Sequence, residues 1–119
     1  MNTLDIGQKL VKFSNEGRSD LAVEQLYGDK VASIESDSTT TNGIEGVQAK
    51  HAWWDANHEV HAAIAEGPYL GHRPDQFVVK FSIDLTPRDA AREQFTEIGI
   101  YTVDNQRIVK EEFLPLQAQ

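Results

Sequence analysis

The spacing of the apolar residues changes at Asn57, and this change limits the folds open to the chain. Before Asn57, Ile6, Leu10 and Phe13 recur at helical intervals and form one apolar stripe. After Asn57, apolar and polar residues alternate, as they do in half-buried strands. Helices followed by a run of strands predict an α+β domain, with helices covering one face of a mostly antiparallel sheet.

Three helices are predicted in the first half of the chain. The first follows Thr3 as N-cap and ends before Gly17, and the second is capped by Ser19 and ends near Tyr27. The third spans about residues 47–57, introduced by Gly46. A strand at 31–35 separates the last two helices, and the polar run 36–42 is a loop or a short edge strand. Four strands follow as a meander, at about 58–70, 76–86, 93–103 and 107–114.

Composition narrows the classes of function. The chain has 119 residues, and we expect 1–119 to form one domain. Its formal net charge of -8 argues against nucleic acid and anionic membranes as partners, since both are bound by clustered Lys and Arg. The absence of cysteine excludes disulfides and thiolate chemistry. The start lacks a signal peptide and no apolar run could span a bilayer, so we expect a cytoplasmic protein. No glycine-rich phosphate loop or nucleophile elbow is present, and we expect no cofactor.

Several segments carry a resemblance to a known family. One helix segment and four strand segments follow one another in a characteristic order. The helix segment contains Gly46-Val47, Lys50 and Trp53-Trp54, and the strand segments lie at 58–61, 75–79, 97–103 and 108–113. In this order they resemble the SnoaL-like branch of the nuclear transport factor 2-like superfamily. The resemblance implies a conical, curved sheet wrapped on three helices around one pocket, and homodimers formed through the sheet. It also implies activities such as aldol-type cyclisation, isomerisation, dehydration and epoxide hydrolysis. The last hairpin departs from the family, with Asn105-Gln106 where Asp-Gly is usual.

The closing hairpin carries the main catalytic candidates. Glu97 and Tyr101 share one face of their strand. If Asn105-Gln106 is a simple two-residue loop, Glu112 lies opposite Gly99 and joins that face. A one-residue bulge would instead bring Glu111 there. Two carboxylates and a phenol could serve as an acid–base set, because crowding and burial raise one carboxyl pKa.

The apolar pattern of this strand supports the opposite orientation, in which the other face turns inward. The face carrying Ile98 and Ile100 is the more apolar, and apolar faces normally turn towards the core. In that case Glu97 and Tyr101 would lie on the outer face. The resemblance favours their pocket-facing orientation.

The segment His58-Glu59-Val60-His61 invites a metal interpretation, but its geometry does not fit. Zinc proteases need two histidines four residues apart on a helix, whereas these are three apart on a strand and point to opposite faces. We therefore expect no metal site. Glu59 and His61 share a face and could act as a base and its orienting partner. A solvated strand face is the competing interpretation.

The pocket is predicted between the third helix and the meander, above the small residues Ala62, Ala63 and Ala65. Trp54 would form its wall or lid, unless it is a core tryptophan. Glu35, at the end of the first strand, could add an acid at the rim.

These features favour a cofactor-free isomerase, cyclase or dehydratase that acts by proton transfer on an apolar carbonyl compound. The partner would be a small apolar or aromatic molecule. The catalytic candidates are Glu97, Tyr101 and His61, and the ligand-binding candidates are Trp54, Glu59, Glu112 and Glu35. The alternative is a non-catalytic ligand-binding or dimerisation module of the same fold.

Overall fold

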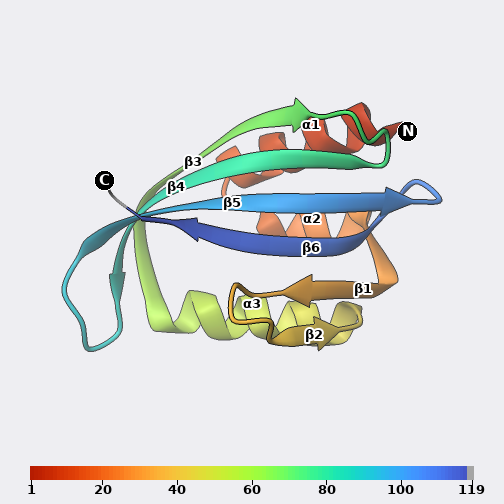
Figure 1. Ribbon diagram of the computed structural model, residues 1–119. Helices are drawn as coiled ribbons and strands as arrows, with labels where there is room; N and C mark the ends of the chain where they lie inside the picture. Colours follow the sequence, from red (N-terminus) through yellow and green to blue (C-terminus); the bar gives the residue numbers. More distant parts are fainter. Residues whose placement is uncertain (118–119) are drawn as a thin grey trace.

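A computed structural model describes residues 1–117, which form three helices and one six-stranded sheet (Figure 1). The helices are α1 (Thr3–Asn15), α2 (Ser19–Leu26) and α3 (Ile44–Asn57). The strands are β1 (Tyr27–Ile34), β2 (Thr40–Asn42), β3 (His58–Leu70), β4 (Gln76–Pro87), β5 (Glu93–Asp104) and β6 (Arg107–Leu116). The strand order is β2-β1-β6-β5-β4-β3, and every pair is antiparallel except β1 with β6. The predicted α+β architecture is confirmed.

The helix starts differ in detail from the prediction. Asn2, not Thr3, caps α1, because its side chain accepts from the backbone N–H of Asp5 at 2.8 Å in a capping box. Thr3 instead donates its hydroxyl to the Pro74 carbonyl at 2.8 Å. Ser19 is the first residue of α2 and makes no cap, since the N-cap position falls on Arg18. Gly17 has the left-handed φ of 70° that was expected after the first helix.

Two elements begin earlier than the sequence indicated. β1 starts at Tyr27, which brings this side chain into the interior. α3 starts at Ile44, after Gly43 with a φ of 86°. The polar run contains the short edge strand β2, one of the two alternatives considered. The four strands of the meander lie where they were predicted.

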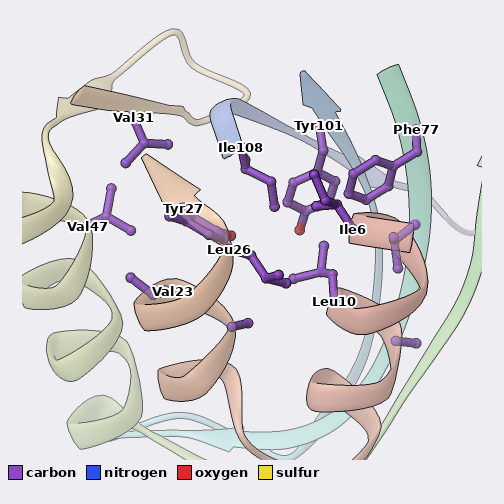
Figure 2. Packing of buried hydrophobic residues seen from close by; sticks show 13 residues of the cluster. Ile6, Leu10, Val23, Leu26, Tyr27, Val31, Val47, Phe77, Tyr101 and Ile108 are labelled. Atoms are coloured by element: carbon purple, nitrogen blue, oxygen red, sulfur yellow. The ribbon is translucent and has the colours of Figure 1, made fainter. Parts of the chain in front are cut away.

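The core lies between the helices and one face of the sheet (Figure 2). Ile6 and Leu10 of α1 are buried as the apolar stripe predicted. On β4 the apolar face turns inward, with Phe77 and Val79 fully buried. We refer to this helix-covered side as the inner face. Among residues 1–117, no helix is both long and apolar enough to cross a bilayer.

The register of the β5–β6 hairpin decides which face of these two strands turns towards the helices. Asn105 and Gln106 form the two-residue loop with φ values of 48° and 64°. A register shift follows, so that β6 carries one extra residue, and Tyr101 pairs with Glu111. The pairing of Gly99 with Glu112 is therefore wrong, because a single-residue bulge inverts the faces of everything beyond it. Glu111 lies on the inner face and Glu112 on the outer face.

Candidate active site

A row of paired residues crosses the inner face of the sheet. Ser33 on β1 pairs with Glu111 on β6, Glu111 with Tyr101 on β5, and Tyr101 with Phe77 on β4. All four side chains are buried. Figure 2 shows the Tyr101 and Phe77 rings lying against α1 residues, in one cluster with Tyr27. Strand pairing thus places a carboxyl and a hydroxyl beside a phenol inside the core.

Glu111 is completely buried, yet both of its carboxylate oxygens are satisfied. The Tyr27 phenol donates to Oε1, and the Ser33 hydroxyl donates to Oε2 at 2.7 Å. Among the described residues, no buried side-chain nitrogen or oxygen lacks a hydrogen-bond partner. A carboxyl at such depth is tolerated only when its oxygens are bonded in this way.

Lys50 connects this buried carboxyl to the edge of the site. Its ammonium group donates to the Ser33 hydroxyl and forms an ion pair with Glu35. It also lies 5.3 Å from the centre of the Phe113 ring. The Lys50 side chain is 24% exposed and that of Glu35 is 43% exposed. These contacts form one continuous chain, which we call the acid–lysine network. It runs through Tyr27, Glu111, Ser33, Lys50 and Glu35.

Glu97 lies beside this network on the inner face of β5. Burial raises its pKa to about 7, and the negative charges of Glu35 and Glu111 add to this effect. The positive charge of Lys50 partly opposes them. At neutral pH the carboxyl is therefore divided between its protonated and ionised forms. A group with this proton affinity can act as either acid or base.

The Tyr101 phenol lies over Gly99, the residue between it and Glu97 on the same face. A Cβ at position 99 would come within 2.7 Å of Tyr101 Cε2 and 3.0 Å of its hydroxyl oxygen. Only glycine leaves this space, and the ring completes its packing by stacking on Phe77 at 5.0 Å. Burial, and then Glu111, raise the pKa of Tyr101 well above its ordinary value. The phenol therefore stays protonated and can donate a hydrogen bond.

The predicted residues on β3 lie elsewhere. Glu59 and His61 are exposed, and the imidazole Nε2 of His61 is 2.7 Å from the Thr86 hydroxyl. Glu59 pairs with Thr86, whereas Glu97 pairs with Phe81 further along β4. The structure thus brings Glu97, Tyr101 and Glu35 together, and it leaves Glu59 and His61 outside the group.

Trp54 and Glu112 also lie apart from the group. Trp54 stacks on His58 with ring centres 4.3 Å apart, so it does not cover the small residues of β3. Ala62 and Ala63 are exposed, and the backbone of Ala65 is bonded by Asn15 of α1. Glu112 is 3.3 Å from Lys110 on the outer face.

Sequence reasoning missed the roles of Lys50, Ser33 and Tyr27. A signal for Lys50 was present, because it follows the fully buried Val47 by three residues and so shares its side of α3. Ser33 alternates with the buried Val31, which places it on the inner face of β1.

Two hollows on the surface lie away from this network. One of about 350 Å³ lies at the end of α3, against His58, the predicted ligand-binding residue Glu59, and Thr86. Another of about 290 Å³ lies near Thr3 and Pro74. Neither contains a residue of the acid–lysine network, and we place the candidate site by its buried, mutually interacting groups. Within residues 1–117, no three His, Asp or Glu side chains are arranged to hold a metal ion.

Comparisons with known proteins agree with this architecture. A sequence profile of the SnoaL-like domain matches residues 1–114. A Mesorhizobium loti structure described as a candidate SnoaL-like polyketide cyclase is 34% identical, with a TM-score of 0.90 over 96% of this chain and 99% of that one. A comparison with curated proteins finds no match.

More distant structures share the fold. A candidate isomerase from Bacillus subtilis is 13% identical, with a TM-score of 0.77 over 98% of this chain and 90% of that one. A nuclear transport factor 2-like protein of unknown function from Exiguobacterium is 17% identical, with a TM-score of 0.71 over 98% and 99%. With the profile match over nearly the whole chain, these likenesses show that the chain belongs to the SnoaL-like family of the nuclear transport factor 2-like fold.

Proposed function

We propose that the chain is a cofactor-free enzyme that moves a proton on a small, neutral, apolar carbonyl compound, as an isomerase, cyclase or dehydratase does. The observation that carries this proposal is Glu97, a partly buried carboxyl whose pKa is raised to about 7 beside a protonated phenol. A carboxyl of ordinary pKa is a weak base, whereas one near neutrality combines basicity with a useful ionised fraction.

The arrangement can perform an enolisation. The Glu97 carboxylate takes a proton from the carbon next to the substrate carbonyl, and the C–H electron pair forms a C=C bond. The carbonyl oxygen gains the negative charge, and the Tyr101 phenol donates a hydrogen bond to it. Where a C=C bond adjoins the α carbon, the negative charge extends to the γ carbon, and Glu97 returns the proton there, which moves the C=C bond into conjugation and completes an isomerisation. In a cyclisation the enolate carbon instead attacks a second carbonyl within the same molecule.

The surroundings of Glu97 favour a neutral, apolar substrate. Three carboxyl groups, those of Glu35, Glu97 and Glu111, act on one another, and Lys50, the one cation that opposes them among the described residues, is already paired with Glu35. An anionic ligand would therefore meet uncompensated negative charge. The neighbours of Glu97 and Gly99 in the sheet, Phe81 and Phe113, add partly exposed aromatic surface. Aromatic rings of this kind suit an apolar or aromatic ligand.

The relatives support the same class of reaction. The Mesorhizobium loti protein is described as a candidate polyketide cyclase and the Bacillus subtilis protein as a candidate isomerase. An aldol-type cyclisation begins with removal of a proton next to a carbonyl group, and so does the isomerisation of an unsaturated ketone.

Hydrogen–deuterium exchange on carbon tests the proposal without knowledge of the product. Neutral apolar ketones are incubated with the protein in D2O, and loss of the α-proton is followed by NMR. We expect exchange above the buffer rate, and Glu97→Gln should slow it by about 10²- to 10⁴-fold. Glu112→Gln, on the outer face, is the matched control and should retain the rate. Exchange that persists in Glu97→Gln would remove the proposed base.

The same ketone panel separates the enzyme from the binding module. Ketones that raise the melting temperature without any carbon exchange would favour a non-catalytic ligand-binding protein. Matched pairs of a carboxylic acid and its methyl ester test the charge argument. The ester should bind and the acid should not.

We also propose a homodimer formed through the outer face of the sheet. Ile64, Tyr69 and Leu114 on this face are each more than half exposed, at 58%, 52% and 53%. Ile64 and Tyr69 lie on β3 and Leu114 lies on β6, so exposed apolar side chains are found on both sides of the outer face, where a second sheet would cover them. Light scattering should give twice the chain mass, and Ile64→Glu with Leu114→Glu should give a monomer. A wild-type protein that is monomeric at high concentration would contradict this proposal.

A further inference from the structure

The edge strand β3 has one regular stretch, at residues 62–66. Within residues 1–117, β3 is the last strand of the order β2-β1-β6-β5-β4-β3, so only β4 pairs with it. Register shifts between Val60 and Ala62, and between Glu66 and Tyr69, interrupt the pairing on either side of this stretch. Bulges, proline and lysine are features that keep an edge strand from pairing with another chain. The stretch 62–66 contains no proline and no lysine, and it lies between the bulges.

Asn15, the last residue of α1, bonds the backbone of this stretch. Its amide oxygen accepts from the N–H of Ala65 at 2.8 Å, and its amide nitrogen donates to the Ala65 carbonyl at 3.0 Å. A neighbouring strand would make the same two kinds of bond to an edge residue. Figure 1 shows α1 lying behind β3 and β4, and its packing against β3 brings the Asn15 amide to the sheet edge.

The two bonds show which backbone groups of β3 point away from β4. In an antiparallel pair, opposite residues alternate between those that bond each other and those whose N–H and C=O point outwards. Ala65 lies opposite Phe81 and is bonded by Asn15 instead, so it belongs to the second kind. Ala63, opposite Ile83 in the same register, therefore also directs its backbone groups to the free edge, and it is exposed. The backbone groups of these two alanines are where a further strand would pair.

We propose that the stretch 62–66 of β3 is a strand-pairing surface for a second copy of this chain, and that the Asn15 amide keeps it closed. A second copy carries the same stretch, and two identical antiparallel edges can pair about a twofold axis. The small side chains of Ala62, Ala63 and Ala65 leave room for such an approach. This pairing would join the edges of two sheets, whereas the homodimer proposed above covers their outer faces.

Hydrogen exchange of two backbone amides, followed by NMR at low protein concentration, tests the closing role of Asn15. In the wild-type protein the Ala65 amide should exchange slowly, and the Ala63 amide on the same edge should exchange fast. Asn15→Ala should speed exchange at Ala65 about tenfold, because it removes the acceptor, and should leave Ala63 unchanged. Asn15 is exposed, so this variant should fold.

A matched control lies at the end of α3. Asn57 donates its side-chain amide to the Trp53 carbonyl at 2.7 Å, away from the β3 edge. Asn57→Ala therefore also removes an asparagine hydrogen bond to the backbone, and it should leave the exchange of both alanine amides unchanged.

Light scattering over a concentration series tests the partner. Purified Asn15→Ala should form larger species than the wild-type protein as its concentration rises, and Asn57→Ala should match the wild type. Adding Ala63→Lys to Asn15→Ala should restore the wild-type size, because a lysine on an edge strand opposes pairing with a like strand. This rescue separates edge pairing from general unfolding, which an added lysine would not reverse.

Three outcomes would overturn the proposal. The first is an Ala65 amide that exchanges as slowly in Asn15→Ala as in the wild type. The second is a set of larger species that persists after Ala63→Lys is added. The third is a purified Asn15→Ala protein that keeps the wild-type size, even if it grows when other proteins are added. Each comparison is with the wild-type protein, so the result depends neither on the proposed reaction nor on the proposed homodimer.

Discussion

Two groups of acid–base residues on the same sheet have very different surroundings. Glu97, Tyr101 and Glu111 lie on β5 and β6, in the middle of the strand order, under the helices. Glu59 and His61 lie on β3, at one edge of the sheet, and are exposed. Both groups have the residue types of general acid–base catalysis. The central group lies in the interior, where burial is the first cause that raises the pKa of Glu97 and that of Tyr101.

The difference shows that position in the sheet decides what such residues can do. A strand with neighbours on both sides and helices above has little water at its inner face, so charges act on one another strongly. An edge strand exposes its side chains, and water screens them. Four predictions, ordered by the size of the expected effect, test whether the central and the edge groups differ in this way.

The largest change in the free energy of unfolding is expected for Glu111, compared with its neighbour Glu112 on the opposite face. Glu111→Ala removes the acceptor of Tyr27 and Ser33, and it should lower the free energy of unfolding by about 3 kcal/mol. Glu112→Ala should change it by less than about 0.5 kcal/mol, because that side chain is on the surface. Urea unfolding followed by circular dichroism measures both. Equal losses in the two variants would contradict the assignment of faces.

The second effect is a pH dependence of stability. The pKa of Glu97 is about 7 in the folded chain against an ordinary value of 4.5, so between these pH values the folded state holds a proton that the unfolded state has lost. This contribution is complete below pH 4.5 and is lost as the pH rises to about 7. The change is on the order of 3 kcal/mol. Subtracting the unfolding free energy of Glu97→Gln at each pH should isolate it, whereas Glu59→Gln should retain the wild-type slope.

The third prediction concerns the glycine beneath the Tyr101 phenol. Gly99→Ala should lower the free energy of unfolding by about 1 to 2 kcal/mol, because the new Cβ would lie 2.7 Å from the ring. Gly71→Ala is the matched control, since a Cβ there has nothing within 4 Å. Thermal unfolding of both variants, with near-ultraviolet circular dichroism for the tyrosine environment, measures this effect. A Gly99→Ala protein with unchanged stability and tyrosine signal would show that the phenol has room to move.

The smallest effect is expected on β3. His61→Ala should change the free energy of unfolding by less than about 0.5 kcal/mol. It should also leave the carbon exchange rate within about twofold, because the side chain is exposed and distant from Glu97. Exchange kinetics over several pH values measures this. A large loss of rate would restore His61 as a catalytic residue and overturn the comparison.

The fold was largely predictable because periodicity is repeated along the whole length of each element. The four strands of the meander and the inner face of β4 follow from alternation alone. Helix caps were less predictable, since Asn2 and Thr3 are both good caps and tertiary contact with Pro74 engages Thr3.

The site was only partly predictable, for physical reasons. The choice between Glu111 and Glu112 depends on one extra residue in β6, and a bulge leaves no clear mark in the sequence. The partnership of Lys50 with Ser33 depends on how α3 packs against β1, which no local pattern encodes. The prediction that Glu97 and Tyr101 face inward relied on the family resemblance, because the apolar pattern of their strand favoured the opposite face as the one that turns towards the core.

The parallel pairing of β1 with β6 has a consequence for how this protein is made. Ser33 and Tyr27 are separated from Glu111 by 78 and 84 residues, so the first and last strands must meet before the carboxyl acquires its partners. During synthesis, β1 leaves the ribosome with one edge open until β6 follows, and an open edge can pair with other chains. Contacts this far apart in sequence also form slowly. Shortened chains that lack β6 would keep this edge of β1 open, and they should depend on chaperones.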